Sequence, residues 1–326
     1  MLTLGGFVKN IVLCFDDINT VGNAAAVTSL LHRDDSQLIW TRPDDGRRPT
    51  TAPHARAVVA AAYEFLVDHW QRGDRIFMFG TAHAAFCARA LARLLGTVGV
   101  VRTEFRDWAL SAYAMPRTSR SAADWRRVGE LAAQLAEDSE LAVDVEFLGL
   151  WDTVAVRGVP RADDSEVLVN VVAARHAVAI DGGYGRRRQR LVPAVAAGVE
   201  EVWFRGGHRD VTGAAGADAP LSAITLDWVL DGAMKAGVLL AASARHRAPA
   251  PSVLDALAGA AHPVPSPKVP ADATVHASVH SYLRAHPGYW RRLPGRVHWA
   301  DLDWAARGER LCAVGQSSPA VLATTG

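Results

Sequence analysis

The stretch Gly73 to Gly96, GDRIFMFGTAHAAFCARALARLLG, predicts a buried strand, a tight turn and a helix in immediate succession. Arg75 to Phe79 is an apolar run of strand length, and Gly80 closes it. The apolar residues that follow recur at helical spacing, and Gly96 stands where a C-terminal cap belongs. A strand that turns sharply into a helix is the geometry of a nucleophile elbow, in which the pattern G-x-S-x-G exposes a serine above a sheet.

The elbow pattern is incomplete in this chain. Its five positions are Gly80, Thr81, Ala82, His83 and Ala84, so alanine stands where the nucleophile belongs. Alanine has no oxygen that can accept an acyl group, and the covalent route through an acyl-enzyme is therefore closed at this position. The alternative interpretation is a plain strand, turn and helix of any α/β protein.

The same run resembles the G-F-S-R-G-A-F-x-A-R-A-L-A signature of a bacterial α/β-hydrolase family typified by phospholipase effectors of type VI secretion. Phe86 and the segment Ala88 to Ala92 match this signature, whereas Thr81 to Ala84 depart from it. The resemblance implies an α/β-hydrolase-like fold, with a mostly parallel central sheet, flanking helices and a helical cap insertion.

An apolar strand near the amino terminus leads to a second group of polar residues. Asn10 to Phe15 is a continuous apolar run, typical of a central parallel strand, and Asp16 follows it. The resembled family has F-D-G-T-x-N-T here, and Asp17-Ile18 replaces its Gly-Thr pair. Because an amide of this loop helps to form the oxyanion hole in hydrolases of this fold, the change weakens the expectation of such a hole. Asp16 is a candidate site residue, and the alternative is that it caps a turn or a helix.

A further strand, Asp144 to Trp151, ends at Asp152. The resembled family has F-L-G-x-W-D-T-V at this place, and the match implies that Asp152 is the acid of a catalytic triad. A buried carboxylate there accepts a hydrogen bond from an imidazole and stabilises its charged form. The alternative is an aspartate that caps a helix.

The candidate histidine follows a glycine-rich strand exit. Glu201 to Arg205 predicts a strand, and Gly206-Gly207-His208 resembles the family's V-W-F-x-G-x-H-x-D-V-G-G. The match implies that His208 is the triad histidine, although lone histidines are more often structural. The order elbow, Asp152, His208 is the order of the triad members in α/β-hydrolases.

Length and composition suit one large α/β domain. The chain has 326 residues and is 50% hydrophobic, and we expect residues 1–326 to form a single domain. A cap insertion is expected at about 103–143, where Trp125 and Val128 share one helical face. A proline-rich irregular segment is expected at about 245–272.

Charge and cysteine content limit the partners and the compartment. A formal charge of +1 gives no electrostatic footprint for nucleic acid. Three widely spaced cysteines in apolar surroundings suggest reduced thiols rather than a disulfide framework. No signal peptide or membrane-spanning run is recognisable, and we expect a cytoplasmic location.

Three functions remain open. The first is a non-hydrolytic enzyme that uses the His208/Asp152 pair for acid-base chemistry on a small molecule, such as cyclisation, elimination or hydration, with His83 and Asp16 as second partner or orienting groups. The second is a pseudoenzyme that binds a lipid or a protein. The third is an ester or phospholipid hydrolase inactivated at Ala82. A metal site is not expected, because no local ligand pair of recognised spacing occurs, and no cofactor is expected.

Overall fold

The computed structural model describes residues 8–17, 22–42, 46–113, 121–136, 141–159, 168–182, 198–242, 253–257 and 269–306. In these residues eight strands form one sheet in the order β2-β1-β3-β4-β5-β6-β7-β8, and every neighbouring pair is parallel. The strands are β1 (Asn10–Phe15), β2 (Gln37–Thr41), β3 (Arg75–Thr81), β4 (Val145–Trp151), β5 (Val171–Ala179), β6 (Val199–Phe204), β7 (Thr274–His276) and β8 (His298–Ala300).

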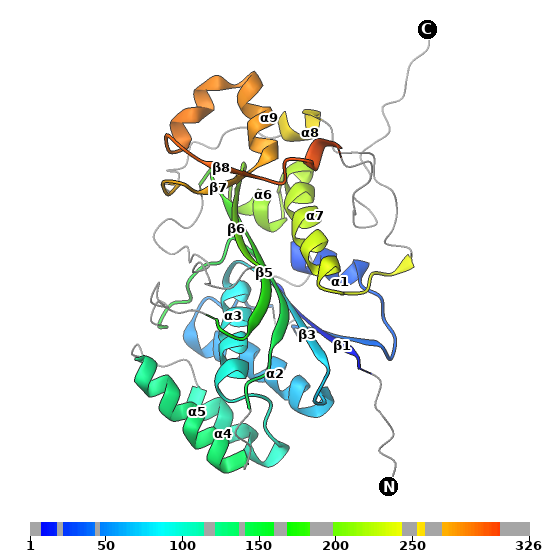
Figure 1. Ribbon diagram of the computed structural model, residues 1–326, viewed down its shortest axis with the longest axis vertical. Coiled ribbons are helices and arrows are strands. Elements are labelled where there is room, and N and C mark those ends of the chain that lie inside the picture. Colours follow the sequence, from blue (N-terminus) through cyan, green and yellow to red (C-terminus); the bar gives the residue numbers. More distant parts are fainter. Residues whose placement is uncertain are drawn as a thin grey trace.

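Helices cover both faces of this sheet (Figure 1). The α-helices are α1 (Asn23–Leu30), α2 (Ala52–His69), α3 (Ala82–Thr97), α4 (Arg106–Tyr113), α5 (Ala122–Ala136), α6 (His208–Thr212), α7 (Ala219–Lys235), α8 (Val253–Leu257) and α9 (Ala277–Ala285). The 3-10 helices within the described ranges are η1 (Thr103–Phe105), η4 (Pro287–Arg292) and η5 (Trp304–Ala306).

Each face of the sheet has its own apolar core. Along β1, Ile11 and Leu13 join the core formed with α2 and α3, whereas Val12 and Cys14 join the core formed with α1 and α7. This alternation follows from the two-residue period of a strand. Because both faces are buried, the central strands are continuous apolar runs, as the sequence predicted.

The order of the strands reverses beside β1. β2 lies on one side of β1, and β3, which comes later in the chain, lies on the other. Ligands of open α/β sheets bind outside the carboxyl ends of strands at such a switch point. The crevice between the ends of β1 and β3 is therefore where this topology favours a site.

The helical insertion predicted at 103–143 is present in its described parts as η1, α4 and α5. Trp125 of α5 lies beneath the guanidinium of Arg93, near the C-terminal end of α3, with 5.4 Å to the ring centroid. Since α3 begins at the elbow, these helices lie beside the far end of α3 (Figure 1), away from the elbow that a cap would cover. Their apolar faces pack instead on the core beside α3.

One further part of the sequence prediction falls largely outside the described residues. Of the proline-rich segment at 245–272, the structure describes only α8 and residues 269–272. None of the helices in the described ranges combines the length and the apolar composition needed to cross a bilayer.

Candidate functional site

The backbone is strained at the elbow predicted at the end of β3. Ala82 has a φ of 49°, a left-handed conformation that residues other than glycine rarely adopt. A Cβ atom on Gly80 would lie 2.6 Å from the Cα of Ala85, so the turn into α3 requires glycine there. The carbonyl of Ala82 accepts a hydrogen bond of 3.0 Å from the amide of Val154. Strain of this kind persists where the surrounding structure enforces it, and it is concentrated at functional sites.

Asp152 and His208 meet beside the elbow. Thr81 and Trp151 are register partners on β3 and β4, so Ala82 and Asp152 follow neighbouring strands. His208 Nδ1 lies 2.7 Å from Asp152 Oδ2, and the aspartate side chain is 1% exposed. Asp152 Oδ1 also accepts a hydrogen bond from a backbone amide of β5, at 3.2 Å. The carboxylate is therefore placed to hold the imidazole of His208 in one orientation.

A buried histidine on β5 supports the backbone that carries Asp152. Asp152 has a φ of 40°, so its backbone is also in the left-handed region. His176 Nε2 accepts a hydrogen bond from the amide of the next residue, Thr153, at 3.2 Å, and lies 3.1 Å from its hydroxyl. The other ring nitrogen of His176 lies 3.2 Å from Glu201 Oε2. A chain of polar contacts therefore runs from Glu201 to the strained turn at Asp152.

Asp16, a predicted site residue, ties three backbone segments together. Its Oδ1 accepts hydrogen bonds from the Thr81 hydroxyl and the Asp17 amide, both at 2.8 Å. Its Oδ2 accepts one of 3.0 Å from the amide of Ala25, in the first turn of α1. A carboxylate at a helix N-terminus satisfies an amide that has no partner within the helix. Through these three contacts the Asp16 carboxylate holds the elbow strand and the start of α1, and none of the three partners is an imidazole.

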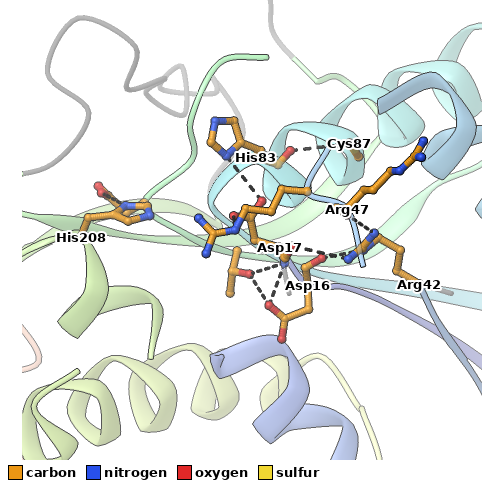
Figure 2. Close-up of polar contacts among 10 residues, drawn as sticks. Asp16, Asp17, Arg42, Arg47, His83, Cys87 and His208 are labelled. Atoms are coloured by element: carbon orange, nitrogen blue, oxygen red, sulfur yellow. Dashed lines mark hydrogen bonds and ion pairs between the residues drawn. The ribbon is translucent and has the colours of Figure 1, made fainter. Parts of the chain in front are cut away.

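His83 approaches the neighbouring acid, Asp17 (Figure 2). His83 Nδ1 and Asp17 Oδ1 lie 3.4 Å apart, in a contact without the alignment of a hydrogen bond. Both side chains are largely buried, 7% and 13% exposed. Arg42 holds the backbone beneath them, because its guanidinium donates to the carbonyls of Asp16 at 2.8 Å and of Asp17 at 3.4 Å.

Two side chains near Ala82 are poor substitutes for the missing nucleophile. Burial raises the pKa of the Cys87 thiol well above its usual range, so this sulfur stays protonated and unreactive. The Thr81 hydroxyl donates to Asp16. Within the described ranges, no group of three or more histidine, cysteine, aspartate or glutamate side chains is placed to hold a metal ion.

The structure therefore brings His208, Asp152, Ala82 and His83 together where the carboxyl ends of the strands lie. Asp16 lies at the same end of the sheet and contacts the Thr81 hydroxyl. Asp17, the partner of His83, was not predicted as a site residue. The residue had been noted only because it replaces a glycine of the resembled family. The pair His176 and Glu201 was not predicted either, because their contact depends on the register of β5 and β6.

Comparisons with known proteins give distant relatives. The uncharacterized protein YEL023C of Saccharomyces cerevisiae is 26% identical over an alignment of 223 residues that covers 56% of this chain and 32% of the yeast protein. A crystal structure of an uncharacterized protein from Pseudomonas aeruginosa is 16% identical, with a TM-score of 0.45, over 72% of this chain and 46% of that one. The Tle1 effector bound to the VgrG spike of the type 6 secretion system is 14% identical, with a TM-score of 0.36, over 64% and 51%.

The chain thus spans about a third of the length of the yeast protein and about half of each of these two solved chains. The family model of the T6SS phospholipase effector Tle1-like catalytic domain matches residues 19–232, which is more than half of the chain. This match includes the elbow, Asp152 and His208. With its parallel sheet and flanking helices, the chain belongs to the Tle1-like family of α/β-hydrolase-fold domains.

Proposed function

We propose that this protein is an α/β-hydrolase-fold enzyme that transfers protons rather than acyl groups, with His208 as general base and Asp152 as its orienting acid. The observation that carries the proposal is the 2.7 Å contact between His208 Nδ1 and the buried carboxylate of Asp152. When Nδ1–H donates to the carboxylate, the lone pair of Nε2 is available to take a proton from a bound molecule.

The residue at the elbow supports proton transfer over hydrolysis. Ala82 offers only a methyl group where a hydrolase of this fold has its nucleophile. In a well-studied serine protease, removal of the nucleophile lowers kcat about 10⁶-fold. An enzyme that keeps an oriented His208 without a nucleophile retains the means for cyclisation, elimination or hydration, because these reactions need no acyl acceptor.

We further propose that residues 1–326 form a single domain that binds a small or lipid-like molecule in the cytoplasm. Cys14 and Cys87 are both buried free thiols, which supports a reducing compartment.

One observation favours a second candidate, an ester or lipid hydrolase that has lost its serine. Ala82 keeps the strained elbow conformation, with a φ of 49°, that a nucleophile at this turn requires. On this second account, His208 and Asp152 are the remaining two members of a triad.

A ring-opening elimination tests the proposal without knowledge of the natural substrate. In 5-nitrobenzisoxazole a base removes the ring C–H proton, the N–O bond breaks, and a coloured nitrophenolate forms. We expect the protein to accelerate this reaction and His208→Gln to lower the rate by about 10²-fold or more. Ala82→Ser should leave the rate within about threefold, because the serine oxygen takes no part in general-base chemistry.

A matched control is available on the surface. His32 pairs with Asp34 at 2.8 Å, and both side chains are nearly half exposed, so His32→Gln removes a histidine–aspartate pair outside the site. It should leave the elimination rate unchanged. Absence of acceleration, or an equal rate in His208→Gln, contradicts the proposal and favours a protein that only binds its ligand.

A further inference from the structure

Three neighbouring strands end in one row at the candidate site. Phe15 of β1 is the register partner of Gly80 on β3, and Thr81 of β3 is the partner of Trp151 on β4. Adjacent strands of a sheet lie about 4.8 Å apart. The residues just beyond these strand ends, Asp17 and Asp152, therefore flank the elbow at Ala82 from its two sides.

Each flanking acid contacts one imidazole. Asp152 contacts His208, and Asp17 contacts His83, which follows Ala82 in the first turn of α3. In Figure 2 the rings of His83 and His208 are drawn apart, and a dashed line runs from the His83 ring to Asp17. The elbow alanine thus has an imidazole paired with a carboxylate on either side.

The position of Asp17 is fixed by its backbone. Its amide donates to Asp16 Oδ1 at 2.8 Å and lies 3.2 Å from the Thr81 hydroxyl oxygen, and Arg42 holds its carbonyl. A half-exposed cation, Arg48, lies 3.7 Å from Asp17 Oδ2. Arg48 and His83 contact different oxygens of this carboxylate, Oδ2 and Oδ1, so Asp17 can stabilise a charge on His83 while it is paired with Arg48.

We infer that His83, oriented by Asp17, is a second proton-transfer group that acts as general acid opposite His208. The inference rests on the proposed function of His208 and deepens it by naming the substrate class. A site with a base on one side and an acid on the other suits a β-hydroxy carbonyl compound, whose loss of water needs one proton removed and another delivered.

The reaction balances without a co-reactant. His208 Nε2 takes the proton from the carbon next to the carbonyl, and the electrons of that C–H bond form the C=C bond as the C–O bond breaks. His83 gives its proton to the departing oxygen, which leaves as water. Proton exchange with solvent then restores both imidazoles. Contacts of this kind are often long in an unliganded enzyme and tighten with substrate, which accommodates the 3.4 Å between His83 and Asp17.

Two substrates separate the acid from the base. The ring oxygen of 5-nitrobenzisoxazole leaves as a stabilised nitrophenolate and needs little help from an acid. The hydroxyl of 4-hydroxy-4-(4-nitrophenyl)butan-2-one is a poor leaving group and needs a proton, and its dehydration gives a conjugated enone that absorbs in the near ultraviolet. We expect His83→Gln to lower dehydration by about 10²-fold and to leave the ring opening within about threefold.

Asp17→Asn is the second variant, because it keeps the size of the side chain and removes only the charge. It should lower dehydration by about tenfold or more with little effect on ring opening. His32→Gln is again the matched control, and thermal unfolding of each variant reports on the fold. If dehydration is equally fast in the wild type, His83→Gln and Asp17→Asn, or if the wild type does not dehydrate the ketone, the inference is overturned. Loss of ring opening only in His208→Gln would at the same time support the proposed function.

Discussion

Substitution of Ala82 by serine places a hydroxyl at the strained elbow, next to His208 and Asp152. A complete Ser, His and Asp set would then be present in the order of an α/β-hydrolase. We nevertheless expect Ala82→Ser alone to remain within about tenfold of the wild type in ester hydrolysis, because the oxyanion formed during acyl transfer would not be stabilised.

The size of this deficit follows from the contacts of Asp17. Its amide, which lies in the loop after β1, already donates to Asp16 and faces Thr81, and loss of one oxyanion donor costs about 10² to 10³ in kcat. The Asp17 carboxylate adds repulsion, since two like charges about 4 Å apart at an effective dielectric constant of about 20 interact by about 4 kcal/mol. That repulsion corresponds to about a further 10³. Together the two effects approach the roughly 10⁶ that a nucleophile contributes.

The assay is hydrolysis of short- and long-chain nitrophenyl esters and of phospholipids by the wild type, Ala82→Ser and Ala82→Ser with His208→Ala. The double variant Ala82→Ser with Asp17→Gly removes the charge and should exceed Ala82→Ser by about 10³. A burst of nitrophenol from Ala82→Ser alone that depends on His208 would refute this reasoning. The hydrolase that has lost its serine would then be the better account.

Three further predictions concern the two buried cysteines, the ion-paired Asp231 and the buried His176. Burial raises the pKa of the Cys14 thiol to about 12 and that of Cys87 further still, so neither should react with a disulfide reagent at pH 8 until the protein is unfolded. The pKa of Asp231 is lowered because, although its burial acts to raise it, hydrogen bonds from Lys235 and Arg175 outweigh that effect. This stabilisation is present above the unfolded pKa and is lost on acidification, so Asp231→Asn should flatten the fall in urea midpoint below about pH 4, and an unchanged slope would contradict it. His176→Leu should slow ring opening of 5-nitrobenzisoxazole more than His176→Gln does, because only glutamine can still accept the Thr153 amide, and equal rates would remove this role.

Apolar patterning predicted the central part of the fold well. The run Asn10 to Phe15 is β1, residue for residue, and the strand predicted at Asp144 to Trp151 begins one residue later, at Val145. The sequence Ser121-x-x-Asp124 resembles a capping pattern, and the two residues exchange capping hydrogen bonds at the start of α5. These features depend on burial on both faces of a strand or on local hydrogen bonds, and both leave a pattern in the sequence.

Features that depend on packing between distant segments were not predictable. Gly96 was expected to end α3, but the helix continues to Thr97. A Cβ atom on Gly96 would lie 2.6 Å from Asn170 Oδ1, so the glycine permits close packing rather than a cap. The choice between Asp16 and Asp17 as the partner of His83 depends on the direction of each side chain after β1, and adjacent residues of an extended chain point to opposite sides.

The central claim is that this site moves protons and does not transfer acyl groups, and one bifunctional molecule tests it most directly. The 4-nitrophenyl ester of 3-hydroxy-3-phenylpropanoate can lose water to give the intact cinnamate ester, or it can be cleaved to release nitrophenol. The account predicts that the wild type forms the cinnamate ester, and that His208→Gln abolishes this product. Release of nitrophenol by the wild type, dependent on His208 and without the cinnamate ester, would contradict it.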